Sequence, residues 1–165
     1  MFVGRLSKEK GVELLAQTAK LLPEYRFVVA GNGPDDACLQ NIPNVTLKGF
    51  VSGAALTDLM GNAKLLIAPS VCYENCPLSI LEAHCLGVPV VTMNSGGMAE
   101  LVEDGKTGGL APEATEQAVA ETVRRCLDDA VYEILKENCQ RAGADIMDVG
   151  AYCRTLLEKY QDLKG

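Results

Sequence analysis

Short apolar runs alternate with helical patterns along residues 1–111, and this alternation limits the folds open to the chain. Between the runs, apolar residues recur at helical spacing, first at Val12, Leu15, Ala16, Ala19 and Leu22. Apolar strands separated by helices are typical of a parallel sheet that helices cover on both faces. The pattern predicts a Rossmann-like, three-layer α/β domain with a parallel sheet of about six strands. The expected strands are 1–4, 26–30, 44–48, 64–69, 88–92 and 108–111.

After Pro112 the pattern changes to helices only, which predicts a helical C-terminal segment. The last helix is expected behind an Asp148 cap, with an apolar face of Val149, Tyr152, Cys153, Leu156, Leu157 and Tyr160. The length of 165 residues fits one domain, residues 1–165. Because the chain opens within a strand, we expect this domain to belong to a larger protein.

Composition excludes several classes of function. A net charge of −7 argues against nucleic acid or an anionic membrane as the main partner. No apolar run approaches the ~20 residues that a transmembrane helix needs, and no signal peptide opens the chain. Seven cysteines without a Cys-x-x-Cys pair, and a single histidine, predict no metal site. We expect free thiols in a reducing cytosol, with Cys85, Cys126 and Cys153 as small core residues.

The segment 73–91 carries the strongest indication of a binding site. It places Glu74 in a polar loop and Glu82 eight residues later, inside the helix that follows. Asn75 is expected to cap this helix, Pro77 to occupy its first turn and Gly87 to end it. Two carboxylates can frame a polyhydroxyl ligand, and the free N–H groups of the helix start can hold its phosphate. The segment therefore predicts a sugar-nucleotide site.

A second segment, residues 4–11, lies at the end of the first expected strand. Arg5 and Lys10 would concentrate positive charge at the edge of the sheet where parallel α/β folds bind ligands. A guanidinium can clamp a diphosphate with two bonds, whereas an ammonium acts as a point charge. Such a loop is by itself most often a solvated surface, but its place beside the Glu74–Glu82 segment favours anion binding.

Two phosphate-binding motifs are excluded by their spacing. A P-loop ending in Gly105-Lys106-Thr107 would need a glycine where Glu100 stands, and a dinucleotide fingerprint after Gly31 would need one at Asp36. Gly31 is therefore interpreted as a turn glycine near the cleft.

Two further features have simpler interpretations. His84 lies two residues after Glu82, so the two side chains point about 200° apart around the helix, and we expect His84 to be structural. Gly96-Gly97 could present amides to a ligand or could only allow a tight turn into a helix. Both alternatives stay open at this point.

Taken in order, the motifs resemble the C-terminal half of a retaining glycosyltransferase of family 4, which has the two-domain GT-B fold. The resemblance runs from about residue 2 to the last helix. Its pieces are residues 4–11, 31–34 and 49–51, Glu74-x7-Glu82, residues 87–91, Gly96-Gly97-x-x-Glu100 and residues 104–108.

The resemblance implies that the chain is a donor domain for a nucleoside-diphosphate sugar. Arg5 and Lys10 would hold the diphosphate and help it depart, while Glu74 would hydrogen-bond the transferred sugar. These three are the implied catalytic residues. Donor-binding positions would be Arg5, Lys10, Gly31, Val51, Glu74, Leu78, Ser79 and Glu82, with the Val51 backbone at the base, Glu82 at the ribose and amides near Leu78 at the phosphate.

The same resemblance implies no cofactor or metal beyond the donor substrate. It implies an absent N-terminal acceptor domain as a partner, through which a peripheral membrane contact stays open. It also implies a cytoplasmic role in polysaccharide or glycolipid synthesis, and a fragment that is nearly inactive alone. Two alternatives stay open: a sugar-nucleotide epimerase-like domain and a non-catalytic nucleotide-binding or scaffold module.

Overall fold

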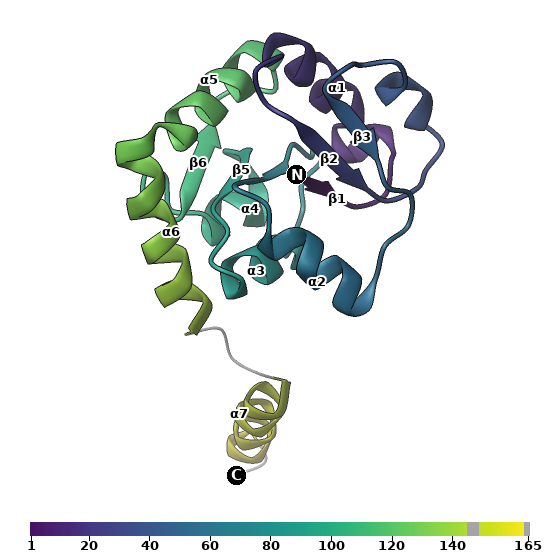
Figure 1. Cartoon of the computed structure of the whole chain (residues 1–165). Helices are drawn as coiled ribbons and strands as arrows, with labels where there is room; N and C mark the ends of the chain where they lie inside the picture. The colour runs from purple at the N-terminus through teal and green to yellow at the C-terminus, as the bar shows by residue number, and fades with distance from the viewer. Residues whose placement is uncertain (145–148, 164–165) are drawn as a thin grey trace.

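A computed structural model describes residues 1–144 and 149–163. Six parallel strands alternate with helices, which confirms the predicted Rossmann-like α/β class (Figure 1). The strands are β1 (Phe2–Val3), β2 (Phe27–Ala30), β3 (Val45–Leu47), β4 (Leu66–Ala68), β5 (Val90–Met93) and β6 (Gly108–Ala111). The α-helices are α1 (Val12–Leu21), α2 (Gly53–Gly61), α3 (Leu78–Cys85), α4 (Gly96–Leu101), α5 (Glu116–Leu127), α6 (Asp129–Ala144) and α7 (Val149–Asp162), with short 3-10 turns at Lys8–Lys10 and Asp36–Leu39.

The strands form two three-stranded sheets, β1-β2-β3 and β4-β5-β6, rather than the single six-stranded sheet that we predicted. β1 contains only two residues, and its ladder is with β2: Phe2 pairs with Val29 and Val3 with Ala30. Met1 makes the junction: its carbonyl accepts from the Ile67 N–H at 2.8 Å, and its ammonium donates to the Leu65 carbonyl at 2.6 Å. The two sheets therefore meet edge to edge without a continuous ladder.

Helices cover both faces of the strands (Figure 1). α1 packs against α5 on one face, and α3 packs against α6 on the other side of the molecule. The predicted face of α1 is buried, and Val29 of β2 and Val90 of β5 are inaccessible to solvent. Strands buried on both faces explain why their sequences are continuous apolar runs.

The start of α3 differs from the prediction. Pro77, not Asn75, is the residue that precedes the first turn, with φ −67° and ψ 110°, and no side chain caps the helix. The fixed φ of proline suits this position. The Asn75 backbone instead lies against Gly97 at the start of α4. The predictions of Asn75 as the cap and of Pro77 within the first turn were therefore both wrong. Gly87 ends the helix with φ 69°, as predicted.

α7 lies apart from the rest of the domain in Figure 1. Its helical periodicity is confirmed, but none of its described residues is buried, and Tyr152, Leu157 and Tyr160 are each more than half exposed. The predicted Asp148 cap falls outside the described residues. None of the described helices combines the length and apolar character that a membrane crossing requires.

All seven cysteines are free thiols, as expected. Cys126 is buried, in agreement with the prediction, but Cys85 and Cys153 are exposed. Cys85 lies on α3 next to the exposed Glu82, and Cys153 belongs to the uncovered helix α7. Cys139 is also buried, and it donates its S–H to the Thr107 carbonyl at 3.1 Å.

Candidate functional site

A cavity of about 280 Å³ opens at the carboxyl ends of β1 and β4. Its position is the ligand-binding edge of a parallel α/β fold. Five residues predicted from the sequence lie in its wall together, although they come from segments more than 60 positions apart in the chain. The lining residues are Phe2, Val3, Gly4, Arg5, Lys10, Ala68, Ser70, Glu74, Pro77, Leu78 and Ser79.

The Glu74 carboxylate is the centre of the polar contacts in this cavity. Its Oε1 atom accepts hydrogen bonds from Lys10 Nζ and, at 2.8 Å, from Ser70 Oγ. The Glu74 side chain is 15% exposed and that of Lys10 is 34% exposed. Burial raises the pKa of Glu74, but the bonds from Lys10 and Ser70 outweigh it and hold the pKa below its usual 4.5. Glu74 is therefore an ionised hydrogen-bond acceptor at neutral pH.

Close backbone packing brings Lys10 to Glu74. Gly11 has φ 71°, and a Cβ atom there would lie 1.9 Å from the Pro69 carbonyl oxygen. The Val71 N–H donates to the Glu9 carbonyl at 3.0 Å. Only glycine allows this contact and this backbone conformation together, so the loop after β1 lies directly on the loop after β4.

The loop that carries Glu74 is held from its other side by α4. The Gly97 N–H donates to the Glu74 carbonyl at 2.8 Å. A Cβ atom at Gly97 would lie 1.8 Å from the Asn75 carbonyl oxygen. The Gly97 amide is thus engaged within the protein and does not face a ligand. The glycine instead allows a close backbone approach between two loops, a role that neither of the two alternatives named.

Glu82 lines a neighbouring cavity of about 470 Å³ between α2 and α3. Leu78 belongs to the walls of both cavities. Glu82 is exposed, whereas His84 is buried on the opposite side of α3, as its helical position predicted. The lining residues are Gly53, Leu56, Thr57, Met60, Leu78, Leu81, Glu82, Cys85 and Leu86.

Gly31 and Val51 lie outside the walls of both cavities. Gly31 follows β2, donates its N–H to the Gly49 carbonyl at 2.7 Å and approaches Gly4 so closely that a Cβ atom would lie 1.8 Å from the Gly4 carbonyl oxygen. Val51 is half-buried between β3 and α2. The structure thus joins Arg5, Lys10, Glu74, Leu78 and Ser79 in one cavity, with Glu82 next to it.

Ser70 is the site residue that the sequence analysis missed. It is 5% exposed, and its hydroxyl binds the same oxygen of Glu74 as Lys10 does. One signal could have found it: Ser70 is a polar residue two positions after β4, at the strand end where ligands bind.

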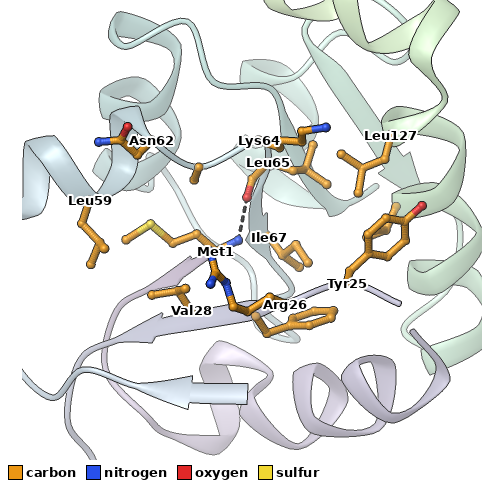
Figure 2. Close-up of a pocket in the computed structure, with 13 residues that line it drawn as sticks. Met1, Tyr25, Arg26, Val28, Leu59, Asn62, Lys64, Leu65, Ile67 and Leu127 are labelled. Carbon is orange, nitrogen blue, oxygen red and sulfur yellow. Dashed lines mark hydrogen bonds between the residues drawn. The ribbon is translucent and has the colours of Figure 1, made fainter. Parts of the chain in front are cut away.

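A third cavity, of about 470 Å³, lies at the opposite edge of the strands, where β2 and β4 begin (Figure 2). Its polar contributors include Arg26, Asn62 and Lys64, and its lining contains no carboxylate side chain. The buried Met1 amino group borders it, and burial lowers the pKa of this group to about 5. This cavity therefore lacks the carboxylates that line the other two cavities, and none of the predicted site residues lies in its wall.

Among residues 1–144 and 149–163, no three His, Cys, Asp or Glu side chains gather closely enough to hold a metal ion. The cations available in the first cavity are those of Arg5 and Lys10.

Comparison with known protein families places this geometry in context. Residues 1–129 match the family described as glycosyl transferases group 1. The chain belongs to this family. As a group 1 glycosyltransferase domain, it has relatives whose names specify sugar transfer.

The chain is 33% identical over 140 residues to the alpha-D-kanosaminyltransferase of Streptomyces kanamyceticus, a match that covers 78% of this chain and 36% of that protein. It is 32% identical over 169 residues to the GDP-mannose-dependent alpha-mannosyltransferase of Corynebacterium glutamicum, covering 98% of this chain and 39% of that protein. The crystal structure of Anabaena Alr3699/HepE in complex with UDP is similar at 25% identity and a TM-score of 0.84, over 98% of this chain and 48% of that one. The chain thus spans less than half the length of these relatives.

Proposed function

We propose that this chain is the donor-binding domain of a retaining glycosyltransferase of family 4, with the GT-B fold. The observation that carries the proposal is that Arg5, Lys10 and Glu74 line one cavity and Glu82 lines the next. Two cations beside carboxylates match a ligand that combines a diphosphate with hydroxyl groups. The HepE structure in complex with UDP and the GDP-mannose dependence in the name of the mannosyltransferase support a nucleoside-diphosphate sugar.

The diphosphate would lie against Arg5, Lys10 and the start of α3. The first N–H groups of a helix have no intrahelical partner, so the amides of Leu78 and Ser79 can donate to phosphate oxygens. Pro77 has no N–H to contribute, which leaves these two amides as the first donors of the helix.

The hydroxyl groups of the ligand would be shared between the two carboxylates. Glu74, deeper in the cavity, would orient the transferred sugar, and the exposed Glu82 would accept from the ribose. In this arrangement the Val51 backbone meets the base, and Gly31 keeps the loops after β1 and β3 close together. Leu78, which the two cavities share, would lie between the sugar and the nucleoside.

In the reaction, negative charge builds on the diphosphate as it leaves the anomeric carbon. Arg5 and Lys10 stabilise that charge, and this is their catalytic role. The acceptor side would come from a second domain of the complete protein, so this chain alone should transfer little or no sugar. The name of a colanic acid biosynthesis glycosyltransferase among the relatives supports polysaccharide synthesis, and free thiols fit a reducing cytoplasm.

Calorimetric titration with UDP-glucose and GDP-mannose tests the proposal. We expect Arg5→Ala and Glu82→Ala to weaken binding about tenfold or more, because each removes charge-assisted hydrogen bonds. Lys8→Ala is the matched control, since Lys8 is an exposed cation of the same loop that lines neither cavity. Equal loss in all three variants, or unchanged affinity in all of them, would contradict the assignment.

A further inference from the structure

Lys10 and Glu74 are assigned to different parts of the ligand, yet the structure pairs them with each other. In the proposed function, Lys10 binds the diphosphate and Glu74 binds the sugar. A ligand that recruits Lys10 therefore competes with Glu74 for the same ammonium group. The consequence depends on what the ligand offers to Glu74 in return.

The third member of this contact is Ser70. Its hydroxyl and the Lys10 ammonium donate to the same Glu74 oxygen, Oε1. Ser70 is 5% exposed, whereas the Lys10 side chain is 34% exposed. Lys10 can therefore swing toward a ligand while Ser70 keeps its bond and holds the carboxylate in the cavity.

Resting on the proposed function, we propose that the Lys10–Glu74 pair makes this cavity prefer a nucleoside diphosphate that carries a sugar over the bare nucleoside diphosphate. Ser70 acts as the positioning residue that keeps Glu74 in place. The pair would also favour release of the bare diphosphate after the sugar has been transferred.

The physical basis is the free-energy cost of leaving the largely buried Glu74 carboxylate without a cationic partner. When a bare nucleoside diphosphate takes Lys10, Glu74 loses its cationic partner and faces the phosphates, so binding is opposed by desolvation and by like-charge repulsion. The terminal phosphate adds further negative charge, because its second pKa is near 6. A sugar instead caps that phosphate and donates its hydroxyls to Glu74, which replaces the bond that Lys10 gave up.

The charges in the cavity wall support this account. Among the lining residues, Arg5 and Lys10 are cationic and Glu74 is anionic. Replacing Glu74 with glutamine would leave both cations without a compensating charge. A bare diphosphate should then bind more tightly, while a sugar nucleotide loses the charged acceptor of its hydroxyl groups and keeps only a neutral one.

The test measures dissociation constants by calorimetry for three matched ligand pairs: UDP and UDP-glucose, GDP and GDP-mannose, ADP and ADP-glucose. For the pair that binds, we expect Glu74→Gln to tighten binding of the bare diphosphate about threefold to tenfold. Binding of the sugar nucleotide should stay the same or weaken, so the preference for it falls. Glu103→Gln is the control: it removes the same charge from an exposed ion pair with Lys106, outside the cavity.

Ser70→Ala tests the positioning role with a second readout. Loss of its hydrogen bond should raise the pKa of Glu74 in a carbon-detected NMR titration and reduce the preference for the sugar nucleotide. Ser7→Ala is the matched control, because the buried Ser7 hydroxyl makes a similar bond of 2.7 Å to Glu9, outside the cavity wall. If Ser70 only packed the loop and did not hold Glu74, its replacement by alanine would leave the pKa of Glu74 unchanged.

The outcomes separate this inference from the function on which it rests. If nucleotides bind but Glu74→Gln keeps the native preference, the inference is wrong and the proposed function stands. If the native chain binds none of the six ligands, both are wrong. If the preference falls in Glu74→Gln and Ser70→Ala but in neither control, the inference is supported.

Discussion

The position of Glu74 depends on two glycines at which the backbone of one loop touches that of another. Gly11 brings the loop after β1 onto Pro69, and Gly97 brings the start of α4 onto Asn75. Both contacts leave no room for a side chain. The geometry of the cavity therefore depends partly on glycines, which contribute no functional group to it.

Gly97→Ala tests this dependence. Its Cβ atom would overlap the Asn75 carbonyl, so we expect the free energy of unfolding to fall by about 1–3 kcal/mol. Urea unfolding at pH 7.5 measures the change. Gly61→Ala, at the end of α2, is the matched control because no atom lies within 4 Å of the added methyl group. It should be neutral or stabilising by up to about 1 kcal/mol, and equal losses in both variants would refute the close-contact account.

At the scale of elements, α3 contributes to the site and to the core at the same time. Its start borders the first cavity, its exposed face carries Glu82, and its buried face packs against α6. His84 lies on the buried face, and its Nε2 atom has no hydrogen-bond partner in the described structure. Burial lowers the pKa of His84 below its usual 6.5, against a backbone hydrogen bond to Thr107 that raises it.

The sign of the resulting pH dependence follows from the pKa. His84 is neutral when folded and gains a proton more readily when unfolded, so its contribution to stability is complete above pH 6.5. That contribution is lost as the pH falls below 6.5 toward the lower pKa of the folded state. We expect the free energy of unfolding to be lower at pH 5.5 than at pH 7.5 in urea titrations.

The control for this prediction is His84→Gln. The Met1 amine, with its pKa lowered to about 5, titrates in the same range, so only the difference between the native chain and the variant reports on His84. The variant should show a smaller loss of stability between the two pH values. An identical loss in both proteins would show that the imidazole does not control this transition.

The order and type of the elements were predictable because strands buried on both faces need continuous apolar runs, and α1 needs one apolar face. The start of α3 was not, because Asn75 as a cap competes with a tertiary contact to Gly97 that local sequence does not encode. The division into two sheets was missed for a similar reason: which strands pair is a tertiary contact, and Met1, which precedes β1, makes the hydrogen bonds across to the β4 segment. The charged residues of the site could be predicted from the sequence. Ser70 could not be assigned in the same way, because it acts through its contact with Glu74.

At the scale of the whole molecule, the core lies within the first 139 residues. Among the residues that the structure describes, every buried hydrophobic side chain falls there, and the described part of α7 buries none. A chain that ends at Ala144 should therefore keep its free energy of unfolding within about 0.5 kcal/mol of the full chain in urea titrations. A loss of more than about 2 kcal/mol would mean that α7 packs against the domain in solution.

The cavities at the two ends of the strands differ in the ligand that they could bind. Carboxylates and cations line the cavity at the carboxyl ends, whereas the cavity of Figure 2, at the amino ends, has no carboxylate in its lining. The most direct measurement is a nitrogen–proton NMR titration of the labelled full chain with UDP-glucose and GDP-mannose. We predict that the largest shift changes fall in residues 4–11, 49–51 and 70–82. Largest changes at Tyr25, Lys64 and Leu127, around the opposite cavity, would contradict the proposed site.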